Sequence, residues 1–290
     1  MKTIARLGLL LLLVLPAAAH DADYTITDNG DGTCTITGYS GIGGSIAIPE
    51  KIGDLWVTGI GVDDQEVFSG CATLTEISIP GCVTNIGNYA FAECDLLTTV
   101  TILNGVTRTG NNAFWYCSGL LSVTIPNSVT NIGDRAFAGC SSLPSITIPD
   151  SVTSIGAGAF DYCSSLSNVY FKGNAPTLSG SGSPDWFRDV PGTAYYLPEK
   201  TGWLPTYGEL DTVLWNPMVK RDDPFGVLSN GFGFTFTNAG NPVIVVEACT
   251  NLFDPMWSPL ATNALVNGSS TFSDLQWTNH PARFYRFRSP

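Results

Sequence analysis

The sequence predicts a mainly β protein: a short solenoid of 23-residue rungs, preceded by a hairpin cap and followed by a small all-β module. Three observations lead to this prediction. Five cysteines are spaced 23 residues apart, a phenylalanine lies three residues before each of them, and a short apolar alternation follows each one. Self-similarity at a period of roughly 20 to 50 residues is typical of stacked repeats, in which each unit contacts only its neighbours.

The first 19 residues have the layout of a secretory signal peptide. Lys2 and Arg6 form a positive start, residues 7–15 are apolar, and Pro16-Ala17-Ala18-Ala19 offers a small-residue cleavage site. The apolar run is too short for a spanning helix, and no later run is long enough. We therefore expect a mature chain that begins near His20 and is secreted or held at the cell surface, with no membrane span after cleavage. A signal anchor is the less favoured alternative.

Residues 20–59 are expected to cap the N-terminal end of the solenoid. Two alternating runs, 24–27 and 33–37, flank the turn sequence Asp28-Asn29-Gly30-Asp31-Gly32. This arrangement predicts a β-hairpin. The turn also hints at a calcium loop, but its carboxylates do not alternate as the EF-hand template requires. The sequence therefore favours a hairpin, and no metal is expected.

The repeats are expected over residues 60–172. An alternation such as Val123-Thr124-Ile125 puts two apolar side chains on one face and predicts a short strand in each rung. A second extended stretch should end at the glycine of the rung, and the spacing of phenylalanine and cysteine predicts a tight corner. The side chains that we expect to form an inward structural ladder are Cys71, Cys94, Cys117, Cys140, Cys163, Phe68, Phe91, Phe114, Phe137 and Phe160.

The repeat motif is clearest from Ile132 to Thr153, as Ile-Gly-x-x-Ala-Phe-x-x-Cys-x-x-Leu-x-x-Ile-Thr-Ile-Pro-x-Ser-Val-Thr. It resembles the BspA-type leucine-rich repeat of bacterial surface proteins, and the resemblance covers roughly residues 46–172. It implies a leucine-rich-repeat solenoid that takes part in adhesion and protein–protein interaction at the cell surface. The motif departs from the more familiar leucine-rich repeat, so the shape of the better-known horseshoes is not expected.

Residues 173–217 are expected to form an aromatic cap. An array must cover the apolar end of its last rung, and the aromatic residues of this segment do not follow the 23-residue period. Ligand stacking on the same rings is the alternative. The runs 169–176, 195–198 and 202–203 resemble an end piece of the same repeat family.

Residues 218–290 are expected to form a linker around residues 220–224 and a small β-sandwich-like module. Two runs, 232–237 and 243–247, have the composition of strands. The segment resembles a short all-β module that ends many secreted proteins of planctomycete and verrucomicrobial bacteria. The matching residues are Thr250-Asn251-Leu252, Trp257, Phe272-Ser273-Asp274 and Arg283-Phe284-Tyr285-Arg286. The resemblance implies no activity. Its arginines could mark a docking strand, although a solvated alternating edge is the favoured interpretation.

The ladder cysteines are expected to be small buried hydrophobes rather than disulfide partners. Cys34, Cys82 and Cys249 lie off the ladder, and the sequence leaves open whether one of them is paired or reactive. No spacing of cysteine and histidine suggests a zinc site.

Charge and motif content argue against several classes of function. The formal net charge of −12 disfavours nucleic acid and anionic lipid as partners, because both require a basic face. The only histidines are His20 and His280, and no nucleophile-elbow or phosphate-loop motif is present. We therefore expect neither an enzyme nor a cofactor, and an unrecognised hydrolase is the least favoured alternative.

The remaining expectation is an interaction protein that binds an extracellular protein or glycan through the solenoid face. The alternative is a carbohydrate-binding accessory module of a polysaccharide-using bacterium. Two outward stripes of hydroxyl residues are expected, Ser78, Thr101, Thr124, Thr147 and Tyr170, and Thr84, Thr107, Thr130 and Thr153. They could bind glycans, but β-propensity on a solvated face explains them better. The candidate ligand contacts are Trp115, Tyr116, Tyr162, Arg108, Arg135 and Tyr89. Trp115 with Tyr116 is the strongest pair, with packing of the corner as the competing explanation.

Overall fold

The computed structural model describes residues 21–62, 64–180, 185–220, 226–228, 231–240, 242–252, 255–280 and 282–290. The predicted signal peptide and cleavage point therefore lie outside the described residues. So does most of the predicted linker, apart from Lys220, which belongs to a strand.

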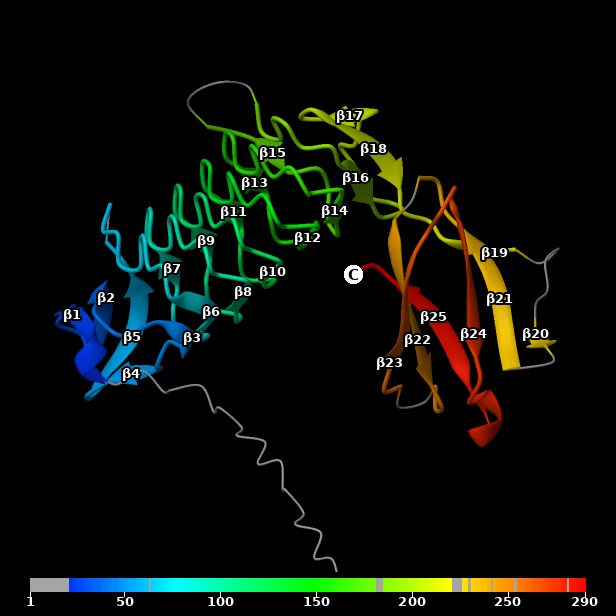
Figure 1. Ribbon diagram of the computed structural model, residues 1–290, viewed down its shortest axis with the longest axis horizontal. Coiled ribbons are helices and arrows are strands. Elements are labelled where there is room, and N and C mark those ends of the chain that lie inside the picture. Colours follow the sequence, from blue (N-terminus) through cyan, green and yellow to red (C-terminus); the bar gives the residue numbers. More distant parts are fainter. Residues whose placement is uncertain are drawn as a thin grey trace, which may run out of the picture.

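The described residues form a β-solenoid and a β-sandwich, and they contain no α-helix. Two short 3-10 turns are the only helical elements in this part of the chain, Asp21–Asp23 and Trp277–Asn279. Figure 1 shows the rungs arranged along an arc. The mainly β fold class and the 23-residue stacking predicted from the sequence are confirmed.

Each rung contributes one strand to an inner sheet and a shorter strand to an outer sheet. The inner strands, on the side of the arc toward the C-terminal module, are β3 (Gly44–Ala47), β6 (Leu74–Ile79), β8 (Thr99–Ile102), β10 (Ser122–Thr124), β12 (Ser145–Ile148), β14 (Asn168–Phe171), β16 (Thr193–Tyr196) and β18 (Leu210–Leu214), with β17 (Thr206–Tyr207) paired to β18. The outer sheet contains β1 (Tyr24–Asp28), β2 (Thr33–Tyr39), β4 (Lys51–Ile52), β5 (Leu55–Ile60), β7 (Asn85–Ile86), β9 (Arg108–Thr109), β11 (Asn131–Ile132), β13 (Ser154–Ile155) and β15 (Thr177–Leu178).

The N-terminal hairpin is present as predicted, with β1 and β2 antiparallel. The carboxylates of its turn accept hydrogen bonds from the turn itself. Asp28 Oδ1 accepts from the Gly30 amide at 2.8 Å, and Asp31 Oδ1 accepts from the Thr33 amide at 3.1 Å and from the Thr33 hydroxyl. These carboxylates therefore stabilise the turn that allows the hairpin to cover the first rung.

The phenylalanine ladder forms a continuous stack along the solenoid axis. Consecutive rings from Phe68 to Phe160 lie 4.9 to 5.6 Å apart, with planes inclined by 3 to 10°. The spacing matches the separation of neighbouring strands, so each ring covers the next one. The rungs therefore bury one another's apolar faces.

The cysteine ladder does more than fill space. The Sγ atoms of Cys94, Cys117, Cys140 and Cys163 each donate a hydrogen bond, at 3.1 to 3.3 Å, to the phenylalanine carbonyl 26 residues earlier. All four side chains are fully buried, and all eight cysteines are free. The thiol therefore gives a buried carbonyl a hydrogen-bond donor, which for Phe68, Phe114 and Phe137 is a second one beside the amide of the cysteine three residues on. Cys71 is the exception, because no earlier corner precedes it, and it is only partly buried.

The solenoid continues beyond the end expected at residue 172. β13 pairs with β15 and β14 pairs with β16, both in parallel register. Phe187 stacks on Phe160 at 5.4 Å and 7°, although it follows at more than one repeat period. Phe187 therefore departs from the 23-residue period, as the sequence indicated, and its ring still extends the stack. The stack depends on the position of the ring in space, and a longer connection between Phe160 and Phe187 still places the Phe187 ring on the stack.

The inner sheet is interrupted between β10 and β12. In the neighbouring rungs, the amide at the start of the strand donates to the rung before, as Leu121 does to the Thr98 carbonyl at 2.9 Å. Pro144 occupies this position in the next rung and has no N–H to donate to Leu121. The two strands do not pair, and Val123 is partly exposed where its counterparts are buried.

The C-terminal module is a sandwich of two antiparallel sheets. One sheet contains β19 (Met218–Lys220), β20 (Gly226–Leu228), β21 (Gly231–Thr237) and β24 (Ser269–Asp274). The other contains β22 (Val243–Cys249), β23 (Ser258–Ala264) and β25 (Phe284–Arg288), in the order β23-β22-β25.

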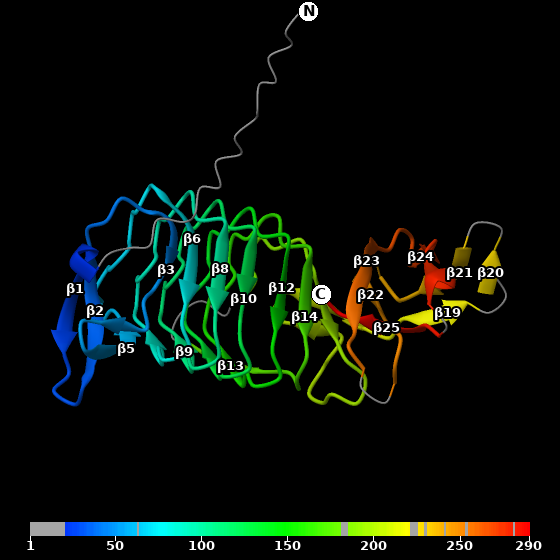
Figure 2. The same cartoon turned by 90° about the horizontal axis from the view of Figure 1, so that it is seen from below.

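The module packs against the end of the inner sheet, and Figure 2 shows it beyond β14 along the long axis. Tyr170, Tyr195 and Trp215 of the solenoid share one apolar core with the aromatic residues of the module. The Tyr170 hydroxyl accepts a hydrogen bond from the Val243 amide at 2.6 Å, and the Thr147 hydroxyl donates to the Pro290 carbonyl at 2.8 Å. Tyr170, predicted to end an outward stripe, is instead buried because the module covers it.

Candidate interaction surface

The corner of each rung imposes an unusual backbone conformation. The residue before the repeated alanine and the residue before the ladder cysteine both have positive φ in successive rungs. The first set is Tyr89, Asn112, Arg135 and Gly158, and the second is Gly70, Glu93, Tyr116, Gly139 and Tyr162, with φ between 50 and 77°. Corner amides in this conformation donate to carbonyls of the next rung, as the Tyr89 amide does to the Asn111 carbonyl at 3.0 Å.

Four of the six candidate contact residues occupy these strained positions: Tyr89, Tyr116, Arg135 and Tyr162. A residue with a Cβ atom pays roughly 1 to 2 kcal/mol for the left-handed conformation, whereas glycine does not. Glycine at three equivalent positions of other rungs was the sequence signal for this geometry. Our sequence reading missed it.

Trp115 and Tyr116 form an aromatic pair at the corner of the third rung, which contains the third ladder cysteine, Cys117. Their ring centroids lie 4.6 Å apart and their planes are inclined by 74°. Trp115 is partly buried and takes the place that Ala92 and Ala138 hold in the flanking rungs. Tyr116 is 46 % exposed, and its ring lies over Gly139, where an added Cβ would approach the ring to 3.1 Å. Trp115 of this pair therefore packs into the corner, while Tyr116 is accessible to a partner.

Tyr162 stands two rungs further along the same corner and is 43 % exposed. Its hydroxyl accepts a hydrogen bond from Arg188 Nη1 at 3.1 Å. The neighbouring Asp161 carboxyl is buried, and burial raises its pKa, against the opposing effects of the Arg188 amide and of the Arg188 and Arg135 charges. Tyr162 is therefore held in place by a polar cluster, while Tyr116 packs through its ring against Trp115 and Gly139.

Arg108 does not join the corner group. It lies on β9, where its Nε donates to Asn85 Oδ1 at 2.8 Å. With Asn88, Asn111 and Asn131 it lines a shallow polar hollow of about 290 Å³ on the outer sheet. The structure therefore places five of the six candidate residues on one edge of the solenoid and Arg108 on a separate face.

The outward threonine stripe serves the stack itself. The hydroxyl groups of Thr84, Thr107, Thr130 and Thr153 each donate to the threonine carbonyl of the rung before, at 3.1 to 3.2 Å. Their donor capacity is thus used between rungs.

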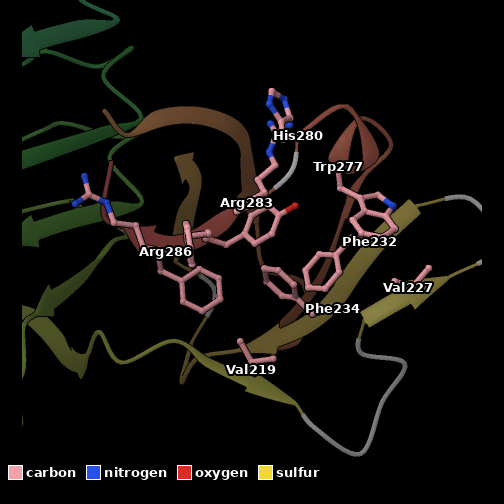
Figure 3. Close-up of a pocket in the computed structure, with 12 residues that line it drawn as sticks. Val219, Val227, Phe232, Phe234, Trp277, His280, Arg283 and Arg286 are labelled. Carbon is pink, nitrogen blue, oxygen red and sulfur yellow. The ribbon is translucent and has the colours of Figure 1, made fainter. Parts of the chain in front are cut away.

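Within the described ranges, no cluster of three or more histidine, cysteine, aspartate or glutamate side chains could hold a metal ion. Nor do these ranges contain a helix with the length and hydropathy that a bilayer crossing requires. A cavity of about 580 Å³ lies in the C-terminal module and was not expected from the sequence (Figure 3).

Comparison with known proteins agrees with the repeat architecture. Residues 64–181 match the family model described as BspA type leucine rich repeat region, in six copies. The chain is similar to the crystal structure of a T. pallidum Leucine Rich Repeat protein, with 25% identity and a TM-score of 0.52 over 67% of this chain and 90% of that one. It is also similar to a leucine rich cell surface protein from Faecalibacterium prausnitzii, with 29% identity and a TM-score of 0.49, and the match spans 67% of this chain but only 57% of that protein. No curated protein matches the sequence.

Proposed function

Because residues 64–181 are a BspA-type leucine-rich repeat region, we propose that this protein is an interaction protein of the cell surface or its surroundings. It binds an extracellular protein partner through the corner surface, defined by Tyr89, Trp115, Tyr116, Arg135 and Tyr162. Exposed aromatic residues together with arginine are the side chains that most often dominate the binding energy of protein interfaces.

One observation carries the proposal: bulky side chains stand at corner positions where the backbone favours glycine. Gly70 and Gly139 show that glycine fits the position that Tyr116 occupies between them. Strained conformations of this kind persist where the surrounding structure enforces them, and they cluster at binding and active sites. Tyr116 therefore supports a binding role better than a purely structural one.

The test separates stability from binding. Tyr116→Gly relieves the positive φ, so the melting temperature should stay unchanged or rise, while binding to the partner should fall at least roughly tenfold. Glu93→Gly is the matched control, because it relieves the same backbone position one rung earlier without removing an aromatic ring.

The partner is sought by probing arrays of extracellular proteins and glycans with the purified chain and both variants. A partner that binds Tyr116→Gly as tightly as the unmodified chain would contradict the corner surface. So would equal losses from Glu93→Gly and Tyr116→Gly.

A second candidate function is glycan binding at the hollow around Arg108. Asparagine amides and a guanidinium group line this hollow, and such groups can bond sugar hydroxyls or a sugar carboxylate. Retained glycan binding in Tyr116→Gly with loss in Arg108→Ala would favour this candidate. No feature of the described residues favours the hydrolase alternative.

Export remains part of the proposal. The arrangement of residues 1–19, a positive start followed by an apolar run and small residues, supports it. Mass spectrometry of the chain expressed with its leader in a bacterial host should find a mature N-terminus near His20. An uncleaved chain would contradict the cleavable signal peptide.

A further inference from the structure

The C-terminal module has an open side that the solenoid does not cover. The strand order β23-β22-β25 leaves β25 at the edge of its sheet, with no partner strand on its other side among the described residues. An unpaired edge presents a row of free N–H and C=O groups and is a template for another strand.

An apolar cavity of about 580 Å³ adjoins this edge. Figure 3 shows it between β25 and the opposite sheet, with Val219, Val227, Phe232 and Phe234 among its lining residues. Its volume is within the range of roughly 300 to 1,000 Å³ that ligand sites occupy, and aromatic and aliphatic side chains form most of its wall. The sandwich is therefore unfilled where its edge is unpaired.

Charge at the edge favours an acidic partner. Glu247 alone faces both Arg286 and Arg288, at 2.7 and 2.8 Å, so this group of three carries one surplus positive charge. These arginines are held on the face of the sheet by Glu247 and do not shield the edge itself. Arg283 lies 3.0 Å from Asp274 through Nε as an ion pair, but its Nε and Nη1 are both buried without a hydrogen-bond partner among the described residues. A buried unsatisfied donor next to a cavity requires an explanation, and an acceptor on a ligand supplies one.

We propose that the edge of β25 and the adjoining cavity receive an extended segment of a partner protein. The segment adds to the sheet as a strand, places alternate large apolar side chains in the cavity and carries a carboxylate near Arg283. In this mode of recognition, main-chain hydrogen bonds provide affinity and pockets for alternate side chains provide specificity. The site is separate from the corner surface, so failure of one proposal leaves the other standing.

The probe is a fluorescein-labelled decapeptide in which threonine alternates with valine and phenylalanine, followed by one glutamate. Fluorescence anisotropy with the purified full chain should show saturable binding. Replacing the peptide glutamate by glutamine should weaken binding roughly tenfold. A peptide with N-methyl groups on alternate amides, which cannot add to a sheet, should not bind.

Val227→Asp is the test variant, because this residue lines the cavity and is 68 % exposed, so folding should be unaffected. It should weaken peptide binding roughly tenfold or more. Val266→Asp is the matched control, since Val266 is 71 % exposed in the same module but does not line the cavity.

Several outcomes would overturn the proposal. They are an absence of binding by the alternating peptide, equal binding of the N-methylated peptide, and equal binding by Val227→Asp. Concentration-dependent dimerisation of the chain that Val227→Asp abolishes would assign the cavity to a second copy instead.

Discussion

The solenoid and the C-terminal module bury aromatic rings in different ways. In the solenoid, the rings from Phe68 to Phe160 are nearly parallel and evenly spaced. In the module, most pairs are tilted or edge-to-face, such as Phe234 with Phe272 at 44° and Phe234 with Phe287 at 74°. The solenoid core thus repeats one ring–ring contact along its axis, whereas the core of the module combines ring–ring contacts of different geometry.

This difference follows from how each region closes its core. From Phe68 to Phe160 each rung meets a neighbour at a constant sequence distance, so the pairing of β8 with β10 repeats that of β6 with β8. In the module, β22 pairs with β25, which joins Val245 to Arg288 across the whole domain. A defect should therefore remain local in the solenoid and spread through the module.

The strongest test of this comparison replaces one ring in each core. Phe114→Ala and Phe236→Ala should each destabilise by about 3 to 5 kcal/mol, because both side chains are fully buried. Hydrogen exchange should show loss of protection that decays with distance from the third rung in Phe114→Ala. In Phe236→Ala the loss should be uniform across the module. Equal spreading in both variants would contradict the comparison.

A smaller effect should come from the cysteine ladder. Cys117→Ala removes the thiol that donates to the Phe91 carbonyl at 3.1 Å and leaves a small void, so it should destabilise by about 1 to 2 kcal/mol in urea unfolding. Cys71→Ala is the control at the same register position, since Cys71 is partly exposed and makes no such bond. Its effect should stay within about 0.5 kcal/mol. Equal effects would show that the thiols act only as filler.

The smallest expected difference between the two regions is in how their stability changes as the pH falls. Burial tends to raise the pKa of Glu247, but the hydrogen bonds and charges of Arg288 and Arg286 outweigh it and hold the pKa below its ordinary value. Its stabilisation is therefore complete above that ordinary value and is lost as the pH falls through the lower folded-state pKa. Asp161 in the solenoid has a raised pKa, so its stabilising contribution is greatest in acid and declines as the pH rises.

Hydrogen exchange corrected for intrinsic rates, followed from about pH 7 to about pH 3, should show residues 243–249 losing protection before residues 154–171. Glu247→Gln should weaken this pH dependence of the module. If the solenoid opened first in both proteins, the assignment to Glu247 would be wrong.

The candidate site was only partly accessible from the sequence. Exposed aromatics that break the repeat, such as Trp115 and Tyr116, could be recognised because the other rungs provide a reference for each position. The break between β10 and β12 also had a sequence signal in Pro144, which lacks the N–H that the register requires. The cavity beside β25 had no such reference, because the module contains no repeat against which a missing strand could be noticed.

The amino-acid sequence alone was sufficient for the rung, its strands and its ladder of phenylalanine and cysteine. Because the repeat has a constant length, residues one repeat apart lie at equivalent places in neighbouring rungs. The repeated pattern in the sequence therefore predicts which residues of different rungs are in contact. Only the tertiary structure decided that Phe187 extends the stack, that the module buries Tyr170, and that one edge of the sandwich has no partner strand among the described residues. These features depend on contacts between segments that are far apart in the sequence and do not repeat, so a periodic pattern cannot predict them.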